Sequence, residues 1–175
     1  MVGTLVVTLP SMYAGGDLMV GHNAREAGLP ATVHAGEATG PRSVWDALRL
    51  GPQRIGHGVR SAEDPRLLEH LAACGVTLEV AITSNVQSGA APSRAQHQLA
   101  ALIAAGVRVA LCADNPTVSN TRLTREYEIA RDLVDAAALD VIRQNALAAR
   151  FTRYADLNRL AGSAGGFAAL PAKTL

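Results

Sequence analysis

The chain has 175 residues, of which 49% are hydrophobic and 18% are charged, enough for one compact domain and too apolar for a disordered chain. Its 16 basic and 15 acidic residues nearly balance, which removes the usual argument for a nucleic-acid partner or a membrane surface. Two cysteines cannot form a disulfide framework, and no apolar run is long enough to span a bilayer, so we expect a cytoplasmic protein.

Short runs rich in β-branched residues alternate along the chain with longer helical stretches. The predicted strands are Val2–Thr8, Ala31–His34, Arg54–His57, Val76–Ala81 and Val107–Cys112. The predicted helices are Asp17–Ala27, Ser43–Leu50, Glu63–Ala73, Arg94–Ala105, Arg122–Ala137 and Asp140–Arg150. Three of these helices are followed by a glycine that is expected to take the left-handed conformation of a C-cap, namely Gly28, Gly75 and Gly106.

This alternation predicts an α/β protein with about five parallel strands, covered by helices on both faces and followed by C-terminal helices. No internal linker divides the chain, so residues 1–161 are expected to form a single domain. The Gly/Ala-rich residues 162–175 are expected to form a loose tail.

Polar residues follow four consecutive predicted strands, at the point where each strand ends. They are His34, His57, the triplet Thr83-Ser84-Asn85, and Asp114. Because the carboxyl ends of parallel strands form the active-site face of a barrel, these side chains are expected to lie together. The alternative interpretation is that loops are polar, so a polar residue follows any strand. For a single position this alternative is the better explanation, but for all four positions together the shared site is.

His34 and Glu37 lie three residues apart, at and just after a predicted strand end. A neutral imidazole can ligate zinc, and a nearby carboxylate can pass a proton between metal-bound water and a substrate nitrogen. The spacing alone favours a different interpretation, in which His34 is a hydrogen-bonded core residue and Glu37 caps the next helix.

The other strand ends also have two interpretations each. His57 lies between two glycines, so its backbone can approach a ligand closely and its ring can orient an attacking hydroxide; otherwise it is an incidental residue in a turn. The triplet Thr83-Ser84-Asn85 has short side chains that can fix loops by hydrogen bonds. Asp114 can ligate a metal or accept a proton from water, or it can cap the following segment.

The order of these motifs resembles the adenosine deaminase family of metal-dependent amidohydrolases. The motifs are His-Ala-Gly-Glu, Ile-Gly-His-Gly, Thr-Ser-Asn and Asp-Asn-Pro, with a trailing Thr124-Arg125-Glu126-Tyr127. The resemblance runs from about residue 16 to about residue 150. It implies a partial (β/α) TIM-type barrel that hydrolyses a 6-aminopurine nucleoside, adenosine to inosine, through water activated by one zinc ion.

The resemblance also implies a role for each motif residue. His34 matches a histidine zinc ligand, and Asp114 matches the aspartate that binds zinc and helps deprotonate the water. Glu37 matches the proton donor to the purine ring nitrogen, and His57 matches the histidine that positions the zinc-bound hydroxide. Asn115 stands where family members often have a second aspartate that contacts the purine, so it is expected to bind substrate.

Two features depart from the family pattern. The family's His-x-His zinc-ligand pair is absent, because the histidines are 22, 34, 57, 70 and 97. The stretch Thr4–Pro10 lacks the glycine and acidic residues of a family loop that contacts the purine. The resemblance places the start of the chain at the fourth of the family's eight strands. With only His34 and Asp114 as zinc ligands, the chain alone is expected to show no measurable adenosine deamination.

Three interpretations of function stay open. The chain is part of a purine nucleoside deaminase, or a catalytically inactive remnant or subunit completed by another chain, or an active relative with another 6-aminopurine substrate. The expected partner is a small-molecule purine nucleoside, with no nucleic acid and no membrane. Two open edges of a partial barrel also predict self-association or poor solubility.

Overall fold

Five strands form one parallel sheet in the order in which they occur along the chain. The computed structural model describes residues 5–8 and 26–152. The strands are β1 (Leu5–Thr8), β2 (Ala31–Ala35), β3 (Arg54–His57), β4 (Thr77–Val80) and β5 (Arg108–Leu111). Parallel neighbours in sequential order, with helices in their connections, are the arrangement of a TIM-type barrel, so the predicted fold class is confirmed.

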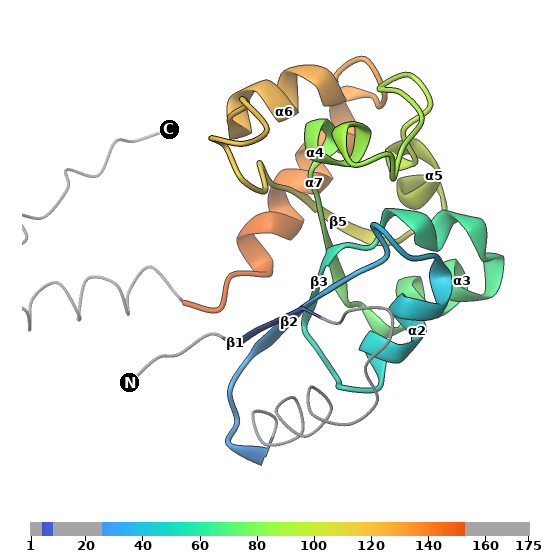
Figure 1. The fold of residues 1–175 in the computed structure, drawn as a ribbon, viewed down its shortest axis with the longest axis vertical. Helices are drawn as coiled ribbons and strands as arrows, with labels where there is room; N and C mark the ends of the chain where they lie inside the picture. The colour runs from blue at the N-terminus through green and yellow to red at the C-terminus, as the bar shows by residue number, and fades with distance from the viewer. Residues whose placement is uncertain (1–4, 9–25, 153–175) are drawn as a thin grey trace, which may run out of the picture.

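Helices fill the connections between the strands, and three of them pack on the same side of the sheet (Figure 1). These three are α2 (Pro41–Leu48), α3 (Pro65–Cys74) and α5 (Leu99–Ala104). A 3₁₀ helix, η1 (Val59–Glu63), precedes α3, and the short helix α4 (Ile82–Gln87) follows β4 directly. After β5 come α6 (Leu123–Ala130), which contacts α4, and α7 (Ala136–Ala148), which packs against β5.

The ends of α3 show why the sequence forms a helix there. Asp64 accepts hydrogen bonds from the backbone N–H groups of Arg66 and Leu67, and Pro65 occupies the first turn. Gly75 ends the helix with a φ of 70°, and its N–H donates to the carbonyl of Leu71. The predicted left-handed glycines are confirmed, since Gly28 and Gly106 also have positive φ.

Two expectations about the helices are wrong. The predicted helix Arg122–Ala137 is interrupted, because α6 ends at Ala130 and Asp135 caps a new helix by accepting from the N–H of Ala138. The triplet Thr83-Ser84-Asn85 does not end a strand but lies in α4. Most of the predicted helix Asp17–Ala27 and the whole of the predicted tail 162–175 lie outside the described residues.

The sheet has one apolar face and one polar face, because alternate residues of a strand point to opposite sides. The apolar face packs against the helices, and the core contributed by both is Val33, Val44, Ile55, Leu67, Leu71, Leu78, Leu102 and Val109. On the polar face, the Thr32 hydroxyl donates to Glu79 at 2.8 Å, and Arg54 pairs with Glu79 at 3.2 Å. The Arg54 guanidinium also lies 3.7 Å from the centre of the Phe151 ring.

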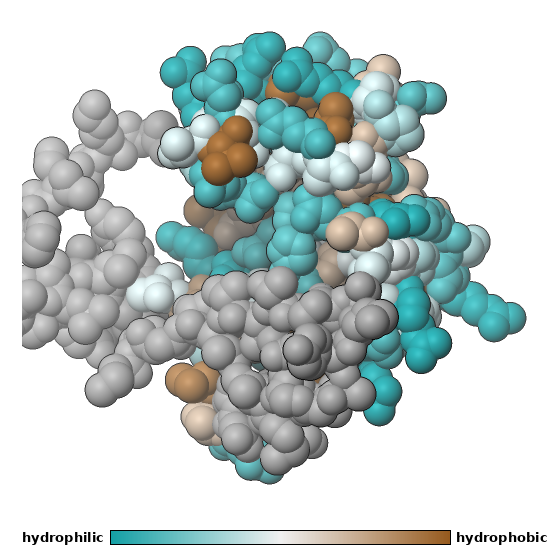
Figure 2. Space-filling model, viewed as in Figure 1, coloured by the Kyte–Doolittle hydropathy of each residue, from teal (hydrophilic) through white to brown (hydrophobic). Residues whose placement is uncertain are grey.

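The described residues visible in Figure 2 are mainly hydrophilic, and the apolar ones among them are scattered. Large apolar side chains exposed in the described part of the chain are Leu29, Val118, Leu123, Val141 and Leu147. In the part of the chain that the structure describes, no helix is long and apolar enough to cross a membrane.

Candidate active site

A cavity of about 380 Å³ opens on the polar face of the sheet, and its lining includes His34, His57 and Asp114. His34 belongs to β2 and His57 ends β3, while Asp114 follows β5 by three residues. The structure therefore brings together side chains that the sequence predicted to meet at the strand ends. Arg54 and Glu79 line the same cavity, so its wall carries both signs of charge.

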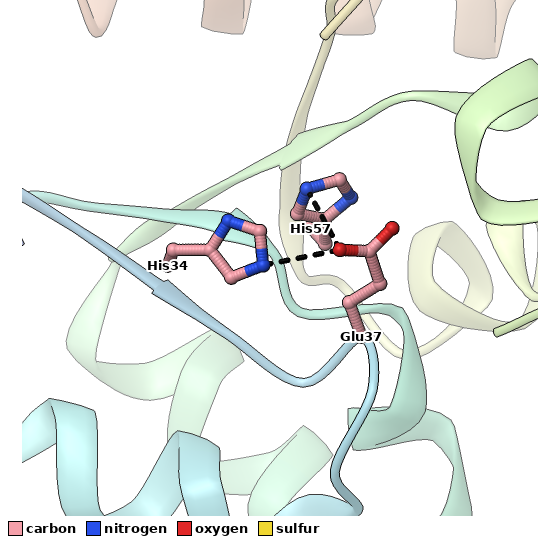
Figure 3. A group of neighbouring side chains, drawn as sticks. All are labelled: His34, Glu37 and His57. Atoms are coloured by element: carbon pink, nitrogen blue, oxygen red, sulfur yellow. Dashed lines mark ion pairs between the residues drawn. The ribbon is translucent and has the colours of Figure 1, made fainter. Parts of the chain in front are cut away.

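The carboxylate of Glu37 contacts both imidazole rings, which also lie against one another with centroids 4.5 Å apart (Figure 3). Its Oε2 atom is 3.1 Å from Nε2 of His34 and 3.4 Å from Nε2 of His57. One ligand atom from each of the three residues lies within 4.8 Å of the others, a spacing close enough for a metal ion. Glu37 does not cap α2, whose N-cap residue is Gly40. The capping interpretation of Glu37 is therefore wrong.

The protonation states in this cluster follow from its contacts. The hydrogen bond to His34 holds the pKa of Glu37 below its ordinary value, against the opposing effect of burial. Glu37 is therefore an ionised carboxylate at neutral pH. Burial lowers the pKa of His57, against the opposing effect of Glu37, so this imidazole is neutral.

The backbone is unusual at two of the site residues. His57 has a φ of 63° and Asp114 a φ of 51°. Non-glycine residues rarely take this left-handed conformation. Here it occurs where each strand gives way to a loop, and both side chains reach the cavity. Because unusual backbone conformations cluster at functional sites, this geometry supports a functional interpretation of both residues.

Helix α4 holds two of the site residues in place. The Ser84 hydroxyl donates to Oδ2 of Asp114 at 2.7 Å, and the Asn85 amide lies 2.9 Å from Nδ1 of His57. All three residues of the triplet Thr83-Ser84-Asn85 are buried. The expectation that their short side chains fix loops by hydrogen bonds is confirmed.

Glu126 of α6 anchors the start of α4 and was not predicted as a functional residue. It is fully buried. Its carboxylate accepts from the backbone N–H of Thr83 at 3.0 Å, from the Thr83 hydroxyl at 2.5 Å and from the Thr121 hydroxyl at 2.8 Å. The feature of the sequence that points to Glu126 is its place in the motif Thr124-Arg125-Glu126-Tyr127, which is part of the family resemblance.

Asn115 lies beside Asp114, but its side chain makes a local contact. Its Oδ1 atom accepts from the backbone N–H of Val118 at 3.0 Å, so Asn115 and not Asp114 caps the turn that follows β5. Asn115 is exposed and does not line the cavity. Its contact with a purine stays a prediction. His22 lies outside the described residues, as do Thr4, Leu9 and Pro10 of the stretch Thr4–Pro10, whose other residues form β1.

Comparison with known proteins identifies the family. A sequence model described as Adenosine deaminase matches residues 12–163. The chain belongs to the adenosine deaminase family. The adenosine deaminase of Serratia proteamaculans (strain 568) is 47% identical over 118 residues, which are 66% of this chain and 36% of that protein. The adenine deaminase of Rhizobium leguminosarum bv. trifolii (strain WSM2304) is 46% identical over 144 residues, which are 78% of this chain and 45% of that protein.

Solved structures of deaminases share the fold. The adenine deaminase from Arthrobacter aurescens superposes with a TM-score of 0.75 at 28% identity, covering 87% of this chain and 49% of that one. The N6-methyl-AMP deaminase from Arabidopsis thaliana superposes with a TM-score of 0.67 at 27% identity, covering 82% of this chain and 43% of that one. The chain thus spans less than half the length of these family relatives.

The residues present fit a zinc ion in part. His34 and Asp114 offer an imidazole and a carboxylate to one cavity, and both are ordinary zinc ligands. The hydrogen bond from Ser84 engages one Asp114 oxygen, Oδ2. Catalytic zinc sites use three protein ligands. The described part of the chain offers the two residues that the family resemblance matches to zinc ligands, and their role as ligands stays a prediction.

Proposed function

We propose that this chain contributes part of a zinc-dependent active site that hydrolyses the 6-amino group of a purine, as in the conversion of adenosine to inosine. The observation that carries the proposal is the contact of Glu37 with both His34 and His57, beside a cavity that Asp114 also lines. Membership in the adenosine deaminase family supports the same reaction class.

His34 and Asp114 would hold the zinc ion, which when bound makes a water molecule nucleophilic at neutral pH. Further ligands have to come from outside the described residues, because the chain contains no His-x-His pair. For this reason the 175-residue chain alone, supplied with zinc, is expected to show no turnover of adenosine in an ultraviolet assay. Turnover that is lost in His34→Ala would contradict this expectation.

Glu37 is the proposed proton carrier. Because its lowered pKa leaves it ionised, it acts first as a base and takes a proton from the attacking water. It then delivers that proton to a ring nitrogen of the purine, which makes the neighbouring carbon easier to attack. After the oxygen has bonded to that carbon, its remaining proton passes to the 6-amino group, the carbon–nitrogen bond breaks, ammonia leaves and a carbonyl oxygen stays on the ring.

His57 and Asn115 have the remaining proposed roles. His57 is neutral and faces Glu37, so its Nε2 atom is in position to orient the attacking water. Asn115 donates through its side-chain amide to a purine nitrogen, which requires its cap on Val118 to leave Nδ2 available.

The substrate class is a 6-aminopurine, and a second candidate within it is adenine itself. The relatives include deaminases of adenosine, of adenine and of N6-methyl-AMP, which share the 6-aminopurine group. The match to the Rhizobium adenine deaminase covers 78% of this chain, against 66% for the Serratia adenosine deaminase. Adenine therefore belongs beside adenosine in any assay.

A chimera tests the proposal. Residues 26–152 of this chain replace the matching segment of the Serratia adenosine deaminase, and adenosine and adenine are each assayed by the ultraviolet change on deamination. Turnover is expected, and Glu37→Gln should reduce it by at least about a hundredfold while the zinc content stays the same. Glu128→Gln, an exposed carboxylate on α6, is the matched control and should retain full activity.

Two outcomes would overturn the proposal. A folded, zinc-loaded chimera that deaminates neither purine would favour the inactive remnant. Loss of zinc in Glu37→Gln would show that Glu37 is a metal ligand and not the proton carrier.

A further inference from the structure

A line of hydrogen bonds leads from the start of α5 to His57, whose other ring nitrogen faces the carboxylate of Glu37. The backbone N–H of Leu99 donates to Nδ1 of His97 at 3.1 Å. Nε2 of His97 lies 3.3 Å from Oδ1 of Asn85, and Nδ2 of Asn85 lies 2.9 Å from Nδ1 of His57. Nε2 of His57 faces Glu37 at 3.4 Å. His57, Asn85 and His97 are all buried, so the contacts among these three side chains are shielded from water.

The backbone amide at one end fixes the direction of every bond in the line. An imidazole or a side-chain amide can exchange its donor and acceptor by a proton shift or a flip, but a backbone N–H can only donate. Nδ1 of His97 must therefore be bare, and its proton lies on Nε2. Oδ1 of Asn85 must accept that proton, which turns Nδ2 toward His57. Nδ1 of His57 is then an acceptor as well.

We infer that His97, acting through Asn85, holds His57 in the tautomer that carries its proton on Nε2. This inference rests on the proposed function, in which His57 meets the attacking water. It makes His57 a hydrogen-bond donor toward the site and His97 a positioning residue that touches neither substrate nor metal. A donor at this place stabilises negative charge that develops on the attacking oxygen.

The direction of these hydrogen bonds also decides which histidine of the cluster His34, Glu37 and His57 can bind a metal. A histidine binds a metal through a bare ring nitrogen. Because Nε2 of His57 carries a proton, this nitrogen is not a metal ligand, although its position near Glu37 would allow it. Among the three residues, His34 is then the imidazole available to a metal.

The test is a direct observation of the tautomers in the metal-free 175-residue chain labelled with ¹⁵N. A long-range proton–nitrogen correlation spectrum at neutral pH distinguishes a protonated ring nitrogen from a bare one. His57 and His97 should each show a protonated Nε2 and a bare Nδ1. Exposed His70 serves as the internal reference with averaged signals. A proton on Nδ1 of His57, or averaged His57 signals, would overturn the inference.

Variants separate positioning from packing. In His97→Gln the new amide can still donate to Asn85, so His57 should keep its proton on Nε2. In His97→Phe the ring volume remains but the donor is lost, Asn85 is free to turn, and the His57 signals should shift toward the tautomer average. Asn85→Asp offers an acceptor to both rings and should move the His57 proton to Nδ1. Identical spectra for the Gln and Phe variants would mean that His97 only fills space.

The inference and the proposed function can fail separately. An inactive chimera whose His57 carries its proton on Nε2 would overturn the function and leave the inference standing. An active chimera whose His57 carries its proton on Nδ1 would overturn the inference and leave the proposed function standing. If a variant does not fold, the spectrum of the unsubstituted chain still decides the tautomer.

Discussion

Gly36, which lies between His34 and Glu37, has no room for a side chain. Its φ is 70°, and an added Cβ would lie 2.5 Å from Cγ2 of Val44 and 3.0 Å from Cα of Gly58. Gly36→Ala is therefore expected to lower the free energy of unfolding by about 2–4 kcal/mol, from backbone strain and overpacking together. Urea denaturation measures this loss.

Gly89 provides the control for the Gly36 prediction. Its φ is 78°, but nothing lies within 4 Å of an added Cβ. Gly89→Ala reports the backbone strain alone, at about 1–2 kcal/mol. Equal losses for the two variants would show that the contact with Val44 relaxes freely and that the space beside the site is not tightly packed.

Buried His97 should make the stability of the chain sensitive to mild acid. Burial lowers its pKa from 6.5 to about 4, against an opposing effect of Glu126. Above pH 6.5 the ring is neutral in both the folded and the unfolded chain and costs nothing. As the pH falls from 6.5 to 4, the unfolded chain binds a proton that the folded chain does not. The free energy of unfolding should therefore fall by about 3 kcal/mol across this window.

The pH prediction is checked by urea denaturation of the native chain and of His97→Gln at a series of pH values. The loss of stability between pH 6.5 and 4 should be smaller in the variant, because Gln does not titrate. His57, whose pKa burial also lowers, contributes to the loss in both proteins and cancels in the comparison. Parallel curves would contradict the prediction.

The sequence located His34, Glu37, His57 and Asp114 because the chemistry at a strand end is local: the residue type and its place after an apolar run are both visible in the chain. It could not locate the partners that orient them. Glu126 lies 43 residues from Thr83, and their contact depends on how α6 folds back onto α4. The roles of the predicted residues stay predictions until activity is measured.

At the scale of elements, Glu126 connects α6 to the start of α4. Removing its carboxylate leaves the backbone N–H of Thr83 and the hydroxyls of Thr83 and Thr121 without this acceptor. Glu126→Ala is expected to lower the free energy of unfolding by at least about 3 kcal/mol. Chemical denaturation followed by circular dichroism gives the value.

The control for this prediction lies on the same helix. Glu128 is exposed and pairs with Arg125 at 2.8 Å, so Glu128→Gln should leave the denaturation midpoint essentially unchanged. If Glu126→Ala is as stable as this control, the buried carboxylate does not hold the two helices together.

The strands were easier to predict than the helices, for a physical reason. Short runs with β-branched residues bounded by Gly or Pro are distinctive, and β2, which lies between Pro30 and Gly36, begins at the predicted residue and ends one residue beyond the predicted end. Helix α4 has only six residues, of which Thr83, Ser84 and Asn85 are poor helix formers, so its pattern is that of a loop. Its helical form depends on the buried acceptor that α6 provides.

At the scale of the whole molecule, the sheet has two edges among the described residues. β1 pairs only with β2, and β5 pairs only with β4. Unpaired backbone groups along a strand are a template for another chain. The chain is therefore expected to self-associate, with a sedimentation coefficient that rises with protein concentration. A constant monomer value over a wide concentration range would contradict this prediction.

The left-handed backbone of His57 and Asp114 has an evolutionary consequence. A side chain in that conformation costs roughly 1–2 kcal/mol that a glycine would not. Selection for stability alone would thus favour glycine at both positions, giving a protein that folds better and has lost an imidazole and a carboxylate from its cavity. In a chain that no longer needed activity, replacement of either residue by glycine would only raise stability. His57 and Asp114 thus keep an imidazole and a carboxylate at the cavity at that cost in stability.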